Sequence, residues 1–279
     1  MSWQARLDLH YRRENLTSQV KFEHIGPLRI LRSLYPEGPG ICHNVLIHPP
    51  SGLVGGDTLD INIDARDSAH ALITTPGATR FYRSASEWAT QNVNVQLHDS
   101  SKLEWLPLET LAYNGCKARN HCKFDLKDQS ELIAWDITAL GMPSANLPFE
   151  TGLIEQHFEL KDHWLDKGRI AAEDLNLLSS PLGLNSRKCL STMIFASASQ
   201  QSQVQINNLL ELAREVLSTD RTGMQTVQAG ATSPNANIVV VRMLSDLVEP
   251  SMQLMQSIWL SWRSNVWGLE SVMPRIWSL

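Results

Sequence analysis

The chain has 279 residues, and its 24 Lys and Arg against 29 Asp and Glu give a formal net charge of −5. This acidic balance argues against a general nucleic-acid binder, because such proteins gain affinity by neutralising phosphates with a basic surface. With 43% hydrophobic and 19% charged residues, the composition also excludes a disordered chain of low hydrophobicity and high net charge.

Short alternating or apolar runs bounded by turn residues dominate residues 1–170. Period-two alternation of this kind is typical of β-strands. The clearest runs are 59–63, 71–75, 93–97, 102–106 and 132–137. We therefore predict a mainly β protein built as layers of short strands, although no fixed-period sequence repeat is evident.

The last third of the chain changes to helical spacing. Apolar residues recur on one face of 205–219 and again of 251–266, which predicts two amphipathic helices. Between them, 237–244 is apolar enough for a fully buried strand. We expect one domain over 1–279, with a loop or sub-domain boundary near 197–203, a polar segment.

The beginning of the chain has charges where a secretory signal requires an apolar segment, and the longest apolar runs are too short to span a membrane. We therefore expect a cytoplasmic protein that associates with neither membrane nor nucleic acid. The four cysteines form no C-x-x-C motif, so in a reducing compartment we interpret them as free thiols.

A glycine-rich segment at 49–57 has two interpretations. It could bind phosphate, but it lacks the Lys-Ser/Thr pair of a phosphate loop and is followed by a strand. The alternative, a tight loop that uses the conformational freedom of glycine, is favoured. Asp57 ends the segment, and its carboxylate either serves the turn or faces a passage or metal.

Thiolate and imidazole groups suggest zinc or nickel ligands. The two candidate sets are Cys42 and His43 with His48, and Cys116 and Cys122 with His121. Neither spacing matches a closed tetrahedral site, and adjacent strand residues point to opposite faces. We therefore expect no tightly bound metal or other cofactor, and buried inert thiols are the alternative interpretation.

Catalytic motifs are not evident: the chain has no G-x-S-x-G elbow and no H-E-x-x-H motif. Carboxylates such as Glu104, Glu109 and Asp136 are present, but the sequence does not set the separation that acid/base catalysis requires. We therefore expect no enzyme. A rival hypothesis is a hydrolase or transferase that uses Cys42 and His43.

Two aromatic segments also have alternative interpretations. The run 79–84 mixes aromatic and basic residues, which suits either ligand stacking or a strand with alternating exposure. Near the C-terminus, tryptophans form either core or an apolar docking surface. These tryptophans are Trp259, Trp262, Trp267 and Trp277.

Five blocks of the sequence, in order, resemble the urease accessory protein UreD (UreH) family. They are 26–38, 42–57, 74–84, 103–113 and 273–277, including CHNVLIHPPSGLVGGD and TTPGATRFYRS. The resemblance implies a mostly β, solenoid-like scaffold that binds urease apoprotein and recruits UreF and UreG into a hetero-oligomeric complex. It also implies that nickel, in transit rather than tightly bound, travels through an internal tunnel lined by polar residues.

By position, the resemblance assigns Asp57, Thr79 and Asp136 as candidates for the nickel passage. The candidates for partner contact or fold stabilisation are Arg80, Tyr82, Arg275 and Trp277.

The segment 140–149 departs from the family pattern L-G-R-P-x-x-G-E-x-F. Met142 and Leu147 stand where that pattern has Arg and Glu. The alternative implied by this departure is a β-rich adaptor that binds the same partners but no longer conducts nickel.

Overall fold

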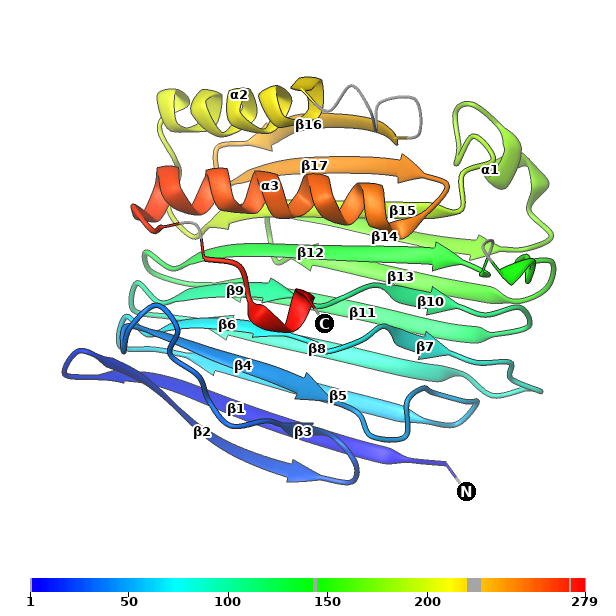
Figure 1. Cartoon of the computed structure of the whole chain (residues 1–279), viewed down its shortest axis with the longest axis horizontal. Coiled ribbons are helices and arrows are strands. Elements are labelled where there is room, and N and C mark those ends of the chain that lie inside the picture. Colours follow the sequence, from blue (N-terminus) through cyan, green and yellow to red (C-terminus); the bar gives the residue numbers. More distant parts are fainter. Residues whose placement is uncertain (1, 143–144, 220–226, 271, 279) are drawn as a thin grey trace.

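The computed structural model describes residues 2–142, 145–219, 227–270 and 272–278, which form two β-sheets and three α-helices (Figure 1). The seven-stranded sheet has the order β14 (Trp164–Ala171), β13 (Leu153–Leu160), β11 (Lys117–Leu126), β8 (Ala89–Leu97), β5 (Thr58–Ala65), β1 (Gln4–Glu14), β2 (Thr17–Ile25). The ten-stranded sheet follows the path β16 (Val227–Asn235), β17 (Ile238–Ser245), β15 (Cys189–Ser197), β12 (Glu131–Leu140), β9 (Lys102–Leu106), β6 (His70–Thr74), β4 (Ile41–Ile47), β3 (Arg29–Ile30). It also holds β10 (Thr110–Ala112), which pairs with β12 and with β7 (Thr79–Phe81).

The chain winds between the two sheets as a β-solenoid. It crosses from the ten-stranded to the seven-stranded sheet in four successive turns, β4 to β5, β6 to β8, β9 to β11 and β12 to β13. Consecutive turns stack their strands in parallel register in both sheets. The predicted mainly β, layered, solenoid-like fold is therefore confirmed.

The main core fills the space between the sheets, because each strand turns alternate side chains inward. Ile61, Val93 and Phe124 from the seven-stranded sheet and Ile73 and Trp105 from the ten-stranded sheet belong to one buried cluster. Each such side chain contributes about 1.5–3 kcal/mol on burial. Polar side chains on inward positions are therefore exceptional, and some of them line the candidate site described below.

A second core lies on the outer face of the ten-stranded sheet, where α2 (Gln203–Thr219) and α3 (Val248–Trp267) pack (Figure 1). Both predicted helices and the predicted buried strand, β17, are confirmed with ends shifted by up to three residues. The segment 197–203 runs from the last residue of β15 to the first residue of α2 and contains the short connection between them, and α1 (Leu175–Ser179) is a single short helix. No helix among the described residues is both long and apolar enough to cross a membrane.

The tryptophans near the C-terminus belong mainly to this second core. Trp259 and Trp262 are fully buried, whereas Trp267 and Trp277 are half-buried. Trp277 lies in the 3-10 helix η2 (Arg275–Ser278), and its indole Nε1 donates to Thr74 Oγ1 over 2.8 Å. Its ring also packs against Trp135 and Trp259. Of the two interpretations, the structure favours core.

A buried ion network fastens α3 to the sheet. Arg263, with no exposed side-chain surface, places Nη1 at 2.9 Å and Nη2 at 3.1 Å from the two carboxylate oxygens of Glu37. The same Nη2 lies 3.2 Å from Glu104 Oε1, which has no exposed surface either. One guanidinium therefore neutralises two buried carboxylates.

Glu104 has further donors around it. Trp259 Nε1 donates to its Oε2 over 2.5 Å, and His70 Nε2 lies 2.8 Å from its Oε1. Burial raises the pKa of Glu104, but its hydrogen bond with His70 and the charges of His70 and Arg263 outweigh burial, so the net pKa is lowered. Glu104, one of the carboxylates for which the sequence indicated no particular role, is thus an ionised structural partner of α3.

Candidate functional site

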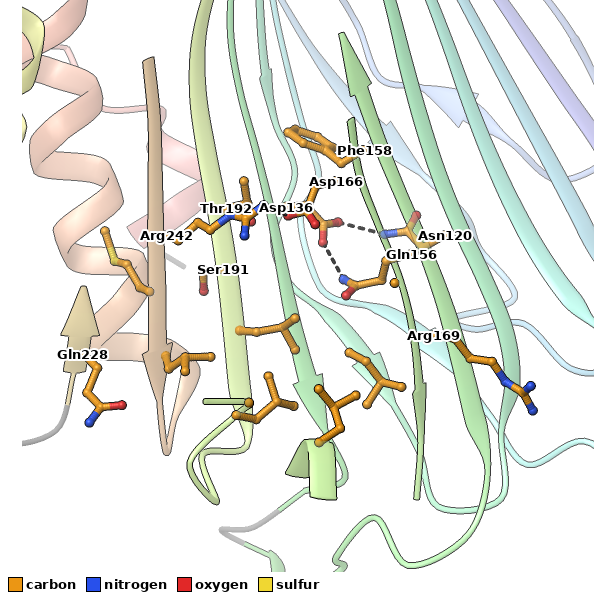
Figure 2. A pocket seen from close by; sticks show the side chains of 18 of the residues that line it. Asn120, Asp136, Gln156, Phe158, Asp166, Arg169, Ser191, Thr192, Gln228 and Arg242 are labelled. Carbon is orange, nitrogen blue, oxygen red and sulfur yellow. Dashed lines mark hydrogen bonds and ion pairs between the residues drawn. The ribbon is translucent and has the colours of Figure 1, made fainter. Parts of the chain in front are cut away.

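A cavity of about 580 Å³ opens between the two sheets at the side where β13 and β14 face β12, β15 and β17. Much of its wall is apolar, as expected for an interior surface. Its polar lining includes Asn120, Asp136, Gln156, Asp166 and Arg242 (Figure 2).

Asp136 is a half-buried carboxylate that lines this cavity. It occupies an inward position of β12, where Asn120 Nδ2 donates to Oδ1 over 2.8 Å and Gln156 Nε2 donates to Oδ2 over 2.9 Å (Figure 2). Burial raises the pKa of Asp136 to about 6, against the lowering effect of hydrogen bonds from Thr138, Asn120 and Gln156. The charge of Asp166 acts in the same direction as burial.

A chain of amides connects this cavity to a second one. Gln91 Nε2 donates to Asn120 Oδ1 over 3.1 Å, and Asn120 in turn donates to Asp136. Gln91 also lines the second cavity, of about 230 Å³, at the other end of this hydrogen-bonded chain. A continuous line of oxygen and amide groups therefore runs through the apolar interior from one cavity to the other.

The second cavity gathers several residues singled out by the sequence. Thr79 and Arg80 line it, together with His48 and the residues 51–53 of the glycine-rich segment. Tyr82 follows on the same strand region, and its ring lies edge-on to Tyr113 at 4.9 Å between centroids. Thr79 and Asp136, predicted to line one passage, thus lie in two cavities that the amide chain joins.

The glycine-rich segment forms a tight loop. Gly56 has a φ of +92°, which favours glycine. At Gly52, a Cβ would come within 2.3 Å of Tyr82 Cε2. Gly56 therefore requires glycine for its backbone conformation, and Gly52 requires it because a side chain there would clash with Tyr82.

Asp57, which ends this loop, is buried and accepts two backbone hydrogen bonds. Trp3 N–H donates to Oδ1 over 2.7 Å, and Val54 N–H donates to Oδ2 over 2.9 Å. The carboxylate also acts on the second cavity: burial lowers the pKa of His48, and the charge of Asp57 opposes that shift. Asp57 thus serves the turn and lies within electrostatic reach of a residue that lines the cavity.

We expect Asp57→Ala to lower the free energy of unfolding by about 1–3 kcal/mol, because it leaves two part-buried backbone N–H groups without their acceptor. Chemical denaturation measures this change, and Asp57→Asn, which keeps one acceptor oxygen, should lose less. The nickel-passage role of Asp57 stays a prediction. Urease activation that falls while unfolding and complex assembly are unchanged would support passage and contradict the structural expectation.

The Cys and His residues considered as metal ligands do not converge. Cys42 points into the main core, with its Sγ at 3.5 Å from Asn44 Oδ1, whereas His43 points to the other face and contacts Glu37 at 2.8 Å. Within the described part of the chain, no three His, Cys, Asp or Glu side chains are grouped so that they could hold a metal ion. Burial raises the pKa of Cys42, which disfavours a thiolate nucleophile there.

Three residues of the amide chain were not predicted from the sequence: Gln91, Asn120 and Gln156. A signal for them exists, since each occupies an inward position between apolar neighbours, as Asn120 does between Ala118 and Cys122. A polar side chain on the buried face of an alternating strand requires a partner. Its partner lies on another strand, which local sequence does not identify.

Comparison with known proteins decides the family. The family model described as "UreD urease accessory protein" matches residues 4–278. The chain belongs to the UreD family. It is 52% identical over 278 residues to a urease accessory protein UreD of Variovorax paradoxus (strain S110), and 48% identical over 279 residues to one of Polaromonas naphthalenivorans (strain CJ2). In both comparisons all of each chain is covered.

Membership of the UreD family places the chain among accessory proteins of urease maturation, which are not catalytic. This finding disfavours the rival hydrolase hypothesis for Cys42 and His43. The two residues that differ from the family pattern, Met142 and Leu147, lie just beyond the end of β12, where Met142 N–H donates to the Leu147 carbonyl over 2.7 Å. Pro143 and Ser144, which belong to the same segment, lie outside the described residues.

Proposed function

We propose that this chain is a cytoplasmic scaffold that passes nickel to urease along the polar line between its two sheets. In this proposal it binds urease apoprotein, recruits UreF and UreG, and acts within that hetero-oligomeric complex. The observation that supports this proposal most directly is the hydrogen-bonded chain from Gln91 through Asn120 to Asp136, which joins two cavities.

The chemistry of this line suits an ion in transit. Nickel held by several thiolate or imidazole ligands would be released slowly, whereas single carboxylates, amide oxygens and water hold it weakly enough to leave. The amide groups of Asn120 and Gln156 can rotate to present oxygen instead of N–H. Asp136 would supply the negative charge that offsets the cost of bringing a cation into the interior.

The adaptor alternative rests on Met142 and Leu147. Neither belongs to the described residues that line the two cavities, and half of the Leu147 side chain is exposed. The departure from the family pattern therefore leaves the polar line from Gln91 to Asp136 unchanged. This supports a conducting scaffold over an adaptor that binds without conducting.

The test is co-expression of urease apoprotein, UreF and UreG with nickel and bicarbonate, with and without this chain. We expect urease activity and urease nickel content to rise only when the chain is present, and a complex containing it to be recovered. A complex that forms without any gain in nickel would favour the adaptor. Full activation without the chain would contradict the proposal.

A further inference from the structure

The larger cavity opens at a side edge of the solenoid, and an ion pair bridges the two sheets at this opening. Arg242 on β17 of the ten-stranded sheet places Nη2 at 2.7 Å from Oδ2 of Asp166 on β14 of the seven-stranded sheet. Both residues line the cavity, and their side chains are 57% and 36% exposed. A solvent-exposed ion pair thus joins the two sheets in front of the half-buried carboxylate of Asp136.

The strand register connects this ion pair to Asp136. Asp136 pairs with Thr192 on β15, and Thr192 pairs with Arg242 on β17. Arg242 therefore lies two strands from Asp136 in the same row of inward positions, roughly 10 Å along the sheet. Figure 2 shows Arg242 projecting toward the side of the cavity that holds Asp136 and Asp166.

Glycines occupy the neighbouring positions on the edge strands of both sheets. Gly230 on β16 is the partner of Arg242, and Gly168 on β14 is the partner of Gln156. Both glycines line the cavity, and a Cβ at either would meet no atom within 4 Å. Space thus remains on both sheets beside the ion pair.

Arg242 also has a second favourable position. Its guanidinium carbon lies 5.9 Å from the ring centroid of Trp164, within the distance for a cation–π contact. A guanidinium that leaves Asp166 can remain against this ring. The carboxylate of Asp166 is then free to accept a cation.

We propose that Asp166 and Arg242 form a charge gate through which a hydrated divalent cation exchanges between the outside of the solenoid and Asp136. With the pair closed, Arg242 neutralises Asp166 and opposes an approaching cation. With the pair open, Asp166 and Asp136 present two carboxylates in succession. This inference rests on the proposed nickel path and adds a lateral opening to it.

Opposite effects of the two halves of the ion pair provide the test. Arg242→Gln leaves Asp166 unpaired and should tighten Ni²⁺ binding to the full chain by roughly tenfold, whereas Asp166→Asn leaves Arg242 unpaired and should weaken it by a similar factor. Equilibrium dialysis against Ni²⁺ measures both. A merely structural ion pair predicts changes in the same direction, or no change, and that result would overturn the gate.

Arg12→Gln is the matched control. Arg12 and Asp67 form an ion pair of 2.9 Å with 52% and 47% exposed side chains, and neither residue lines the cavity. We expect Arg12→Gln to leave Ni²⁺ binding unchanged. An equal gain in Ni²⁺ binding in Arg12→Gln and Arg242→Gln would mean that only the net charge matters, and it would overturn the gate.

Narrowing the opening gives a second measurement. Gly230→Leu adds a side chain where space is open, so we expect the fold to be retained and the release of Ni²⁺ to a chelator to slow at least severalfold. Unchanged release would contradict a lateral opening.

The path and the gate can fail separately. If Asp136→Asn leaves nickel transfer intact, the proposed path fails. If it abolishes transfer while Arg242→Gln and Asp166→Asn behave like Arg12→Gln, the gate alone fails.

Discussion

Arg263→Ala should lower the free energy of unfolding by about 3–5 kcal/mol, because it leaves Glu37 and Glu104 buried without their shared cation. For a chain of this size that loss corresponds to a decrease in Tm of roughly 6–20 °C. Denaturant unfolding followed by tryptophan fluorescence is suited to the measurement, since Trp259 lies 4.7 Å from the guanidinium.

Two variants separate this expectation from general damage to α3. Arg263→Lys keeps the charge but not the two-pronged contact with Glu37, so it should lose less than the alanine variant. Arg12→Ala removes an exposed ion pair and should cost less than about 1 kcal/mol. Equal losses in Arg263→Ala and Arg12→Ala would contradict the account of α3 anchoring.

Asp136→Asn should make the protein more stable at pH 7.5, by roughly 3 kcal/mol, because burial raises the pKa of Asp136 to about 6 from an ordinary value of 3.8. The folded state then binds the proton more tightly than the unfolded state. The free energy of unfolding of the natural protein therefore falls as pH rises from about 4 to 6 and stays lowered above that range. Asparagine carries no charge and avoids this cost.

Denaturant titrations of both proteins at pH 7.5 and near pH 4.5 give the comparison. The difference in the free energy of unfolding between Asp136→Asn and the natural chain should shrink at the lower pH. Asp67→Asn is the control, since this exposed residue has a φ of 55°, which asparagine tolerates, and should change little at either pH. A less stable Asp136→Asn, or a gap independent of pH, would contradict the assigned environment.

Local pattern predicted much of the fold. Helical spacing located α2 and α3 because each has one apolar face against the ten-stranded sheet, and alternation located strands such as β5 and β8. Alternation also predicted that Cys42 and His43 point to opposite faces. The solenoid was predicted from the family resemblance. Its turns share a backbone register but no fixed-period sequence repeat, so sequence pattern alone does not reveal them.

The candidate site was less predictable. Asp136 and Thr79 were selected by family position, yet the groups that join their cavities, Gln91 and Asn120, come from separate solenoid turns. Only parallel register brings these strands together. The contact of Arg263 with Glu37 spans 226 positions of the chain, a separation over which local periodicity carries no information.

The central claim is that nickel reaches urease along the interior that contains Asp136. The most direct measurement is the nickel content of urease matured in co-expression with the natural chain, with Asp136→Asn or with Asp67→Asn. We predict that all three chains enter the complex, and that Asp136→Asn alone lowers urease nickel roughly tenfold, the factor that 1.4 kcal/mol of lost interaction with the ion produces. Equal nickel content for Asp136→Asn and the natural chain, within complexes of the same composition, would contradict it.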